Sequence, residues 1–225
     1  MNNDSFVRAI RSRDYMSCVA SLPDGVHFVV GTHHWTGDTL CFEVKLYHVD
    51  GTLVHTFKGH TSHVSSVAVA RDGRHIVSAS SLCLKVWSVA TKSLVSTCWP
   101  PATLDGCRSL CVTAPMPDGQ RIVGGSNDGD IGVWSLRGNL EAWWKQLHVG
   151  LVRALVALPD NQHALSGSQD ATVKLFNVND GVVLRTFTLH TRPVHCLALL
   201  PDGLRFVSGS NDDTARIAYH GLAPQ

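Results

Sequence analysis

The chain consists of five copies of one pattern, and this repeat limits what it can fold into. Each copy contains a tight-turn pair, and successive turn aspartates lie 48, 46, 42 and 42 residues apart, at Asp24-Gly25, Asp72-Gly73, Asp118-Gly119, Asp160-Asn161 and Asp202-Gly203. A period of about 40 to 45 residues is typical of folds that repeat one supersecondary unit. The sequence therefore predicts five similar units rather than one large sheet.

The copies also share residue types at fixed distances from the turn aspartate. A histidine stands twelve residues before it in three copies, and a hydroxyl residue stands eight residues after it in all five. An aspartate follows at ten residues and an aromatic residue at sixteen. The residues are His60, His148 and His190; Thr32, Ser80, Ser126, Ser168 and Ser210; Asp128, Asp170 and Asp212; and Trp134 and Phe176, with Trp87 displaced by one residue.

Each copy is predicted to form four short strands. In the fourth copy these are residues 152–158, 163–168, 172–177 and 183–187. Val, Ile, Leu and Phe dominate these segments, whereas Asp, Asn and Gly lie between them, as expected for pleated, half-buried strands joined by tight turns. Stacking such sheets around an axis protects their faces and leaves only short edges.

These motifs resemble the WD-repeat (beta-transducin) family of β-propellers. The segment from Gly59-His60 to Trp87 and the segment 166–176 carry the resemblance most closely. It implies an all-β fold, a propeller of about five four-stranded blades, in a single domain over residues 1–225. It also implies a non-enzymatic scaffold, although one fold hosts many functions and a function has to be argued from a site.

The two ends of the chain allow two interpretations of the ring. The fifth copy lacks a fourth strand, whereas residues 5–10 resemble the outer strand of another copy, residues 53–57. Residues 5–10 are therefore predicted to pair with the last blade, because an unpaired sheet edge promotes aggregation. Rings of this family most often have seven blades, so the alternative is that the five copies form part of a larger ring.

Composition argues against several partners. The formal net charge is +1, with 16% charged residues, whereas nucleic-acid-binding domains usually carry a strongly basic surface. No apolar segment reaches the length of a membrane span. The seven cysteines contain no C-x-x-C pair, which favours reduced thiols inside the cell, in the cytoplasm or also the nucleus.

The resemblance also implies a polar network inside each blade that links a histidine, a hydroxyl, an aspartate and an indole. No copy has all four members. The predicted members are His60, Ser80 and Trp87; Ser126, Asp128 and Trp134; His148, Ser168 and Asp170; and His190, Ser210 and Asp212. We expect these residues to be structural and not catalytic, because such sets recur at equivalent positions.

Neither catalysis nor a cofactor is indicated. The sequence has no P-loop, no H-E-x-x-H and no G-x-S-x-G motif. No metal is predicted, since the closest histidines lack C-x-x-C partners, although a cluster of His27, His33 and His34 near Cys41 stays open. Asp38 and Glu43 are the only acidic pair in an irregular insertion, residues 33–43, of the first copy.

The expected function is capture of a peptide or protein partner. In the family, the residues that flank the first apolar residue of each inner strand and those that directly precede the network aspartate, here Asp128, Asp170 and Asp212, line the narrow face. Carried over, the partner-binding candidates are Tyr15, His63, Arg153, His195, Asn127, Gln169 and Asn211. An adaptor in ubiquitin-linked or signalling assemblies is one form of this role, and a carbohydrate-directed ring, either glycosidase or lectin-like, is the alternative. The insertion and Trp143-Trp144 are two further candidate surfaces.

Overall fold

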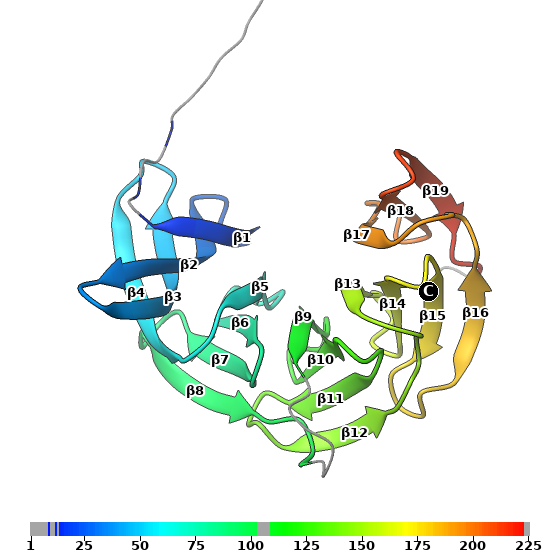
Figure 1. Ribbon diagram of the computed structural model, residues 1–225, viewed down its shortest axis with the longest axis horizontal. Helices are drawn as coiled ribbons and strands as arrows, with labels where there is room; N and C mark the ends of the chain where they lie inside the picture. Colours follow the sequence, from blue (N-terminus) through cyan, green and yellow to red (C-terminus); the bar gives the residue numbers. More distant parts are fainter. Residues whose placement is uncertain (1–8, 10–11, 13, 103–108, 223–225) are drawn as a thin grey trace, which may run out of the picture.

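Five antiparallel β-sheets fan around a common axis in the computed structural model, which describes residues 9, 12, 14–102 and 109–222. Figure 1 shows their inner strands following an open arc, with the first and last sheets on either side of the opening. The described residues form no helix, and so none that could span a membrane. The predicted all-β propeller of about five blades is confirmed.

Each sheet is a blade whose strands follow in chain order from the axis outward. Blade 1 comprises β1 (Tyr15–Ser21), β2 (His27–Thr36), β3 (Thr39–His48) and β4 (Leu53–His60). Blade 2 comprises β5 (Val64–Val69), β6 (His75–Ser80), β7 (Leu84–Ser88) and β8 (Ser93–Cys98). Blade 3 comprises β9 (Leu110–Pro115), β10 (Arg121–Ser126), β11 (Ile131–Ser135) and β12 (Leu140–Trp144).

The last two blades differ in strand number. Blade 4 comprises β13 (Val152–Ala157), β14 (His163–Ser168), β15 (Val173–Asn177) and β16 (Val183–Phe187), within one residue of the predicted bounds. Blade 5 comprises β17 (Val194–Leu199), β18 (Arg205–Ser210) and β19 (Ala215–Tyr219). Among the described residues no fourth strand pairs with β19. Residues 5–8 and 10 of the predicted closing strand lie outside that range.

The turn aspartates explain why each inner hairpin closes at the same place. Asp160 Oδ1 accepts hydrogen bonds from the backbone amides of Gln162 and His163, and Asp24, Asp118 and Asp202 accept equivalent pairs. The next residue has a positive φ, 72° at Gly25 and 59° at Asn161. Glycine and asparagine tolerate this conformation, so the Asp-Gly and Asp-Asn pairs fix the turn.

The core lies between blades and not within them. Alternate strand residues point to opposite faces of a sheet, so each blade presents one apolar face to each neighbour. The joint between blades 4 and 5 buries Leu165 and Leu175 from one side against Val194 and Phe206 from the other. Three equivalent clusters fill the joints between blades 1 and 2, 2 and 3, and 3 and 4.

The insertion in the first copy is a regular hairpin, which corrects the predicted irregular loop. β2 and β3 each have ten residues, and their ladder continues from His33↔Phe42 to Thr36↔Thr39. The aromatic and β-branched residues of this segment favour strand conformation, and Gly37, with a φ of 59°, supplies the turn. The hairpin thus extends blade 1 beyond the length of the other blades.

Trp143 and Trp144 both pack between blades, one on each face of β12. The Trp143 ring contacts Trp134 edge to face, and Trp144 contacts Phe176 in the same way. Both side chains are half-buried, as strand alternation predicts. They serve the two adjacent joints and offer no fully exposed indole for a lateral contact.

Candidate functional site

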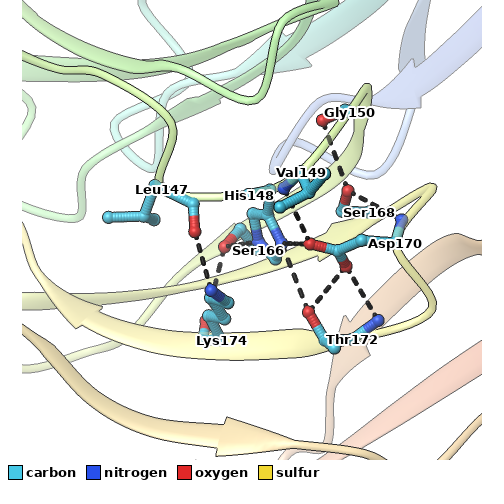
Figure 2. Close-up of polar contacts among 9 residues, drawn as sticks. All are labelled: Leu147, His148, Val149, Gly150, Ser166, Ser168, Asp170, Thr172 and Lys174. Atoms are coloured by element: carbon cyan, nitrogen blue, oxygen red, sulfur yellow. Dashed lines mark hydrogen bonds and ion pairs between the residues drawn. The ribbon is translucent and has the colours of Figure 1, made fainter.

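Blade 4 holds the most complete polar network, which Figure 2 shows. His148 Nε2 lies 2.7 Å from Ser166 Oγ, and His148 Nδ1 lies 2.8 Å from Asp170 Oδ2. A carboxylate can only accept, so Nδ1 carries the proton and Nε2 accepts the Ser166 hydroxyl hydrogen. Thr172 Oγ1 donates to Asp170 Oδ1 at 2.6 Å. The imidazole is therefore fixed in one tautomer and one orientation.

Asp170 also anchors two loops. Its carboxylate accepts the backbone amides of Val149, at 3.0 Å, and Thr172, at 2.9 Å. Burial alone would raise the pKa of Asp170, but the hydrogen bond from Thr172 and the neighbouring His148 outweigh it and lower the pKa. Burial is also the main reason that the pKa of His148 is lowered. The network therefore stabilises a neutral histidine beside an ionised aspartate.

Blade 5 repeats this arrangement. His190 lies 2.8 Å from Ser208 Oγ and 2.9 Å from Asp212 Oδ2, and the Thr191 amide donates to the same carboxylate oxygen. The hydrogen bond from the Thr214 side chain is the main cause that lowers the pKa of Asp212, and further hydrogen bonds add to it. The aromatic position of this blade is Ala218, so no indole joins the network.

Blade 2 keeps the indole and loses the aspartate. His60 Nε2 lies 2.7 Å from Ser78 Oγ, which accepts a 2.8 Å hydrogen bond from Trp87 Nε1. The turn after β6 is one residue shorter than in blade 4 and has no acidic residue. His60 Nδ1 is consequently buried without a partner in the described part of the chain. Burial, aided by Lys85, lowers the pKa of His60 to about 4.

The predicted hydroxyl members of the network were placed two residues too late. Ser78, Ser166 and Ser208 contact the histidines, whereas Ser80, Ser168 and Ser210 hold the following turn. Residues two apart share a strand face, so both positions face the same side, and only the earlier one reaches the imidazole. The earlier serine also recurs at a fixed offset, six residues after the turn aspartate, in three copies. That recurrence was an available signal.

Blade 3 departs further from the prediction. Gly106 occupies the histidine position, Asp128 is exposed, and Ser126 Oγ accepts the amides of Asp128 and Asp130. Trp134 Nε1 donates to the backbone oxygen of Trp99. Asp130, which sequence reasoning missed, is buried and accepts hydrogen bonds from Trp143 Nε1 and the Gln146 amide.

Blade 1 replaces the network with an ion cluster that sequence reasoning also missed. Lys45 Nζ donates to Asp14 Oδ2 and lies 3.4 Å from Glu43 Oε2, and His34 Nδ1 lies 3.6 Å from Asp14 Oδ1. Burial would raise the pKa of Asp14, but the Lys45 ammonium outweighs it and lowers the pKa. The cluster joins the start of β1 to the long β2–β3 hairpin.

The structure does not bring His27, His33 and His34 together as a metal site. His27 bonds Asp24 at one end of β2, six residues and about 20 Å of extended strand from His33. Over the described ranges no three His, Cys, Asp or Glu side chains cluster as metal ligands do. His33 instead stacks on Tyr15, with ring centroids 5.1 Å apart, and contacts His63 edge to face at 5.3 Å. Two partner-binding candidates, Tyr15 and His63, therefore share one aromatic group.

A β-bulge positions the residues at the mouth of the axis. In the pairing of β13 with β14, the register shifts between Val152 and Ala154, so Arg153 is the unpaired bulge residue; His195 has the same place on β17. Bulges redirect a side chain out of the regular ladder. Both residues line an axial cavity of about 710 Å³ to which all five inner strands contribute.

The three remaining candidates lie beside this mouth. Asn127, Gln169 and Asn211 are exposed, and their backbone N–H groups donate to the backbone oxygens of Ser109, Leu151 and Pro193, which lead into the inner strands. Thus Arg153 and His195 share one cavity, and Tyr15 and His63 share an aromatic group. The other three candidates contact the strand entries through their backbones. These placements come from geometry, and partner binding stays a prediction.

Comparison with known sequences agrees with this architecture. The family described as WD domain, G-beta repeat matches residues 51–88, 98–135, 145–177 and 181–217. The chain belongs to this family. The matches begin at residue 51 and leave out the first three strands of blade 1, which include the long hairpin. The COMPASS component SWD3 of Saccharomyces cerevisiae is 30% identical over 108 residues, which cover 44% of this chain and 33% of that protein. The alignment therefore spans about a third of that WD-repeat relative.

Replacing Asp170 with alanine should destabilise the fold by about 1 to 3 kcal/mol, because His148 Nδ1 and the Val149 amide lose their acceptor. Urea denaturation measures the change. Asp128→Ala is the matched control, since the same turn position in blade 3 is exposed and has no histidine to orient. It should change the free energy of unfolding by less than about 0.5 kcal/mol. Equal effects of the two substitutions would contradict the assigned role of Asp170.

The free energy of unfolding should also decrease as the pH is lowered, because of His60. Its pKa is about 4 in the folded chain against an ordinary 6.5. The unfolded chain therefore takes up the proton first, and stability is lost between pH 6.5 and 4, by roughly 3 kcal/mol. Denaturation at several pH values should give a shallower slope in this range for His60→Gln. An unchanged slope would show that His60 does not titrate in this way.

Proposed function

We propose that this chain is a non-enzymatic interaction scaffold that binds a carboxylate-bearing peptide or protein segment at the mouth of the axial cavity. The supporting observation is Arg153, whose Nε is buried and has no hydrogen-bond partner within the described residues. A buried donor without an acceptor is costly, so a ligand that supplies one gains binding free energy. His195 on the neighbouring inner strand lines the same cavity.

The chemistry of the site selects an acidic ligand. Guanidinium pairs with carboxylate through two parallel hydrogen bonds. The exposed residues Gln169 and Asn211 contact, through their backbones, the segments that lead into β13 and β17. The cavity lining includes Arg153 and His195 and contains no Asp or Glu among the residues described. An acidic group therefore meets cationic and neutral donors without like-charge repulsion.

The same lining favours binding over the carbohydrate-directed alternative. A glycosidase needs two facing carboxyl groups about 5 to 10 Å apart. The cavity supplies none from the described inner strands. Asp38 and Glu43 lie on the β2–β3 hairpin, and Glu43 is engaged by Lys45. A lectin-like ring remains the alternative that the binding experiment separates from peptide capture.

Family membership and the yeast relative support a role inside a protein assembly. SWD3 carries the name of a COMPASS component, and this chain belongs to the WD-repeat family. We extend the scaffold role to this chain as a proposal, with adaptor duty in ubiquitin-linked or signalling assemblies as its narrower form. Such assemblies place it in the cytoplasm or the nucleus.

The double substitution Arg153→Ala with His195→Ala should abolish capture of acidic peptides. Defined peptide sets, acidic, neutral and basic but equal in length, are titrated and followed by fluorescence anisotropy. The wild-type chain should prefer the acidic set, because a carboxylate forms charge-assisted, bidentate hydrogen bonds with guanidinium that a neutral carbonyl cannot form. Unfolding free energy should stay within about 0.5 kcal/mol, as expected for side chains outside the joints.

Arg137→Ala is the control, because this exposed arginine lies in the turn before β12 and outside the cavity lining. It should leave binding unchanged. Deleting residues 35–43 tests the hairpin. Binding that survives the double substitution but disappears with this deletion would place the site on blade 1. Equal binding of all three peptide sets, or binding of oligosaccharides alone, would contradict the proposal.

A further inference from the structure

The two end blades expose the faces that every internal joint buries. On blade 1 this receiving face consists of Met16, Val19 and Phe28, and on blade 5 the presenting face consists of Val207, Ala215 and Ile217. Figure 1 shows these blades on either side of the opening in the arc. The two exposed faces are equivalent to the two sides of an internal joint.

The receiving face is defined by the repeat register. Met16, eight residues before the turn aspartate, is 43% exposed, whereas its counterparts in blades 2 to 5 are fully buried, at Val64, Leu110, Val152 and Val194. Phe28 is half-exposed, and its counterparts are fully buried at Ile76, Ile122, Ala164 and Phe206. Val19 is 67% exposed. A hollow of about 340 Å³ lies over these residues, lined by Met16, Val19, Phe28 and Val30 among others.

The presenting face follows the same logic at the other end. Ile217 is 63% exposed, whereas its counterparts are at most 2% exposed, at Leu46, Val86, Val133 and Leu175. Ala215 is exposed where blade 4 has the buried Val173. Blade 5 therefore offers blade 1 of another molecule the apolar strip that blades 1 to 4 offer to their neighbours.

We propose that these faces bind a second copy of this chain head to tail, with the presenting face of one molecule on the receiving face of the next. The argument is continuity with an interface already formed four times in the molecule. In three of the four internal joints the counterparts of Val19 and Ile217 pack in one cluster, as Leu197 and Leu175 do between blades 4 and 5; between blades 2 and 3 the counterpart of Val19 is the polar Thr113. The chain supplies both halves of this contact, so no other protein is needed to provide it.

The geometry permits such a joint without closing a flat ring. Packed sheets cross either nearly aligned or close to a right angle, so the second copy can tilt out of the plane of the first. A contact between two different surfaces is heterologous and continues from copy to copy unless the rotation closes. Self-association should therefore grow with concentration beyond a dimer.

The test uses one blocked face per variant. Val19→Asp blocks the receiving face and Ile217→Asp the presenting face, and both side chains are exposed enough to leave the fold intact. Sedimentation velocity over a wide concentration range should show association of the wild-type chain and loss of it in each variant alone. An equimolar mixture should form a dimer of twice the chain mass and nothing larger, because one intact face of each kind remains.

Val95→Asp is the control for non-specific hydrophobic association, since Val95 is an exposed apolar residue on the outer strand β8, away from both faces. It should associate like the wild-type chain. Circular dichroism and melting confirm that each variant is folded, and Val19→Lys and Ile217→Lys replace any aspartate variant that is not. A wild-type chain that stays monomeric, one variant that still dimerises by itself, or a mixture without a dimer would each overturn the proposal.

Discussion

The face-to-face contact between neighbouring sheets is the interaction on which the rest of the structure depends. No blade has a core of its own, because all four apolar clusters span two blades. A sheet of three or four short strands gains stability only by covering its apolar faces, so each blade is folded by its neighbours. This dependence explains why Ile122 and Phe206, at equivalent positions in different blades, are both fully buried.

The polar network is secondary to these joints, and its variation shows why. Blade 4 pairs His148 with both Ser166 and Asp170, whereas blade 2 lacks the aspartate and adds a hydrogen bond from the Trp87 indole to Ser78. Blade 1 has the Asp14–Lys45 ion pair instead. The blades still share strand order and register. The network therefore fixes the loops that connect blades, where buried amides and imidazoles need partners, and leaves the sheet architecture to apolar packing.

Sequence reasoning recovered what is local and periodic. The turn aspartates, the strand bounds of blade 4 and the family follow from spacing, since Asp-Gly turns and strand alternation are read within a few residues.

Sequence reasoning failed where a choice between residues depends on the three-dimensional fold. Ser166 and Ser168 share a face and only the fold decides which one reaches His148, and Asp130 is recognised only through Trp143 from another strand. The sequence could not choose between a ring of five copies and part of a larger ring, because curvature accumulates over all joints. The axial cavity was anticipated only as a set of flanking positions, and the bulge at Arg153 explains why those positions face the axis.

Blade 5 links the proposed peptide site to the proposed self-association. In a linear array, each unit is stabilised by its own strands and by its nearest neighbours, and blade 5 has a neighbour on one side only among the described blades. It also has three strands within the described residues, so it should open at lower free energy than blades 2 to 4. His195 lies on β17 of this blade, so the cavity wall is complete only while blade 5 is folded. A second copy that covers Ile217 stabilises the folded blade by mass action, and a ligand held between Arg153 and His195 stabilises the same blade from inside the arc. The two binding events therefore favour one another through the folding of a single blade, without any change in the shape of the other four.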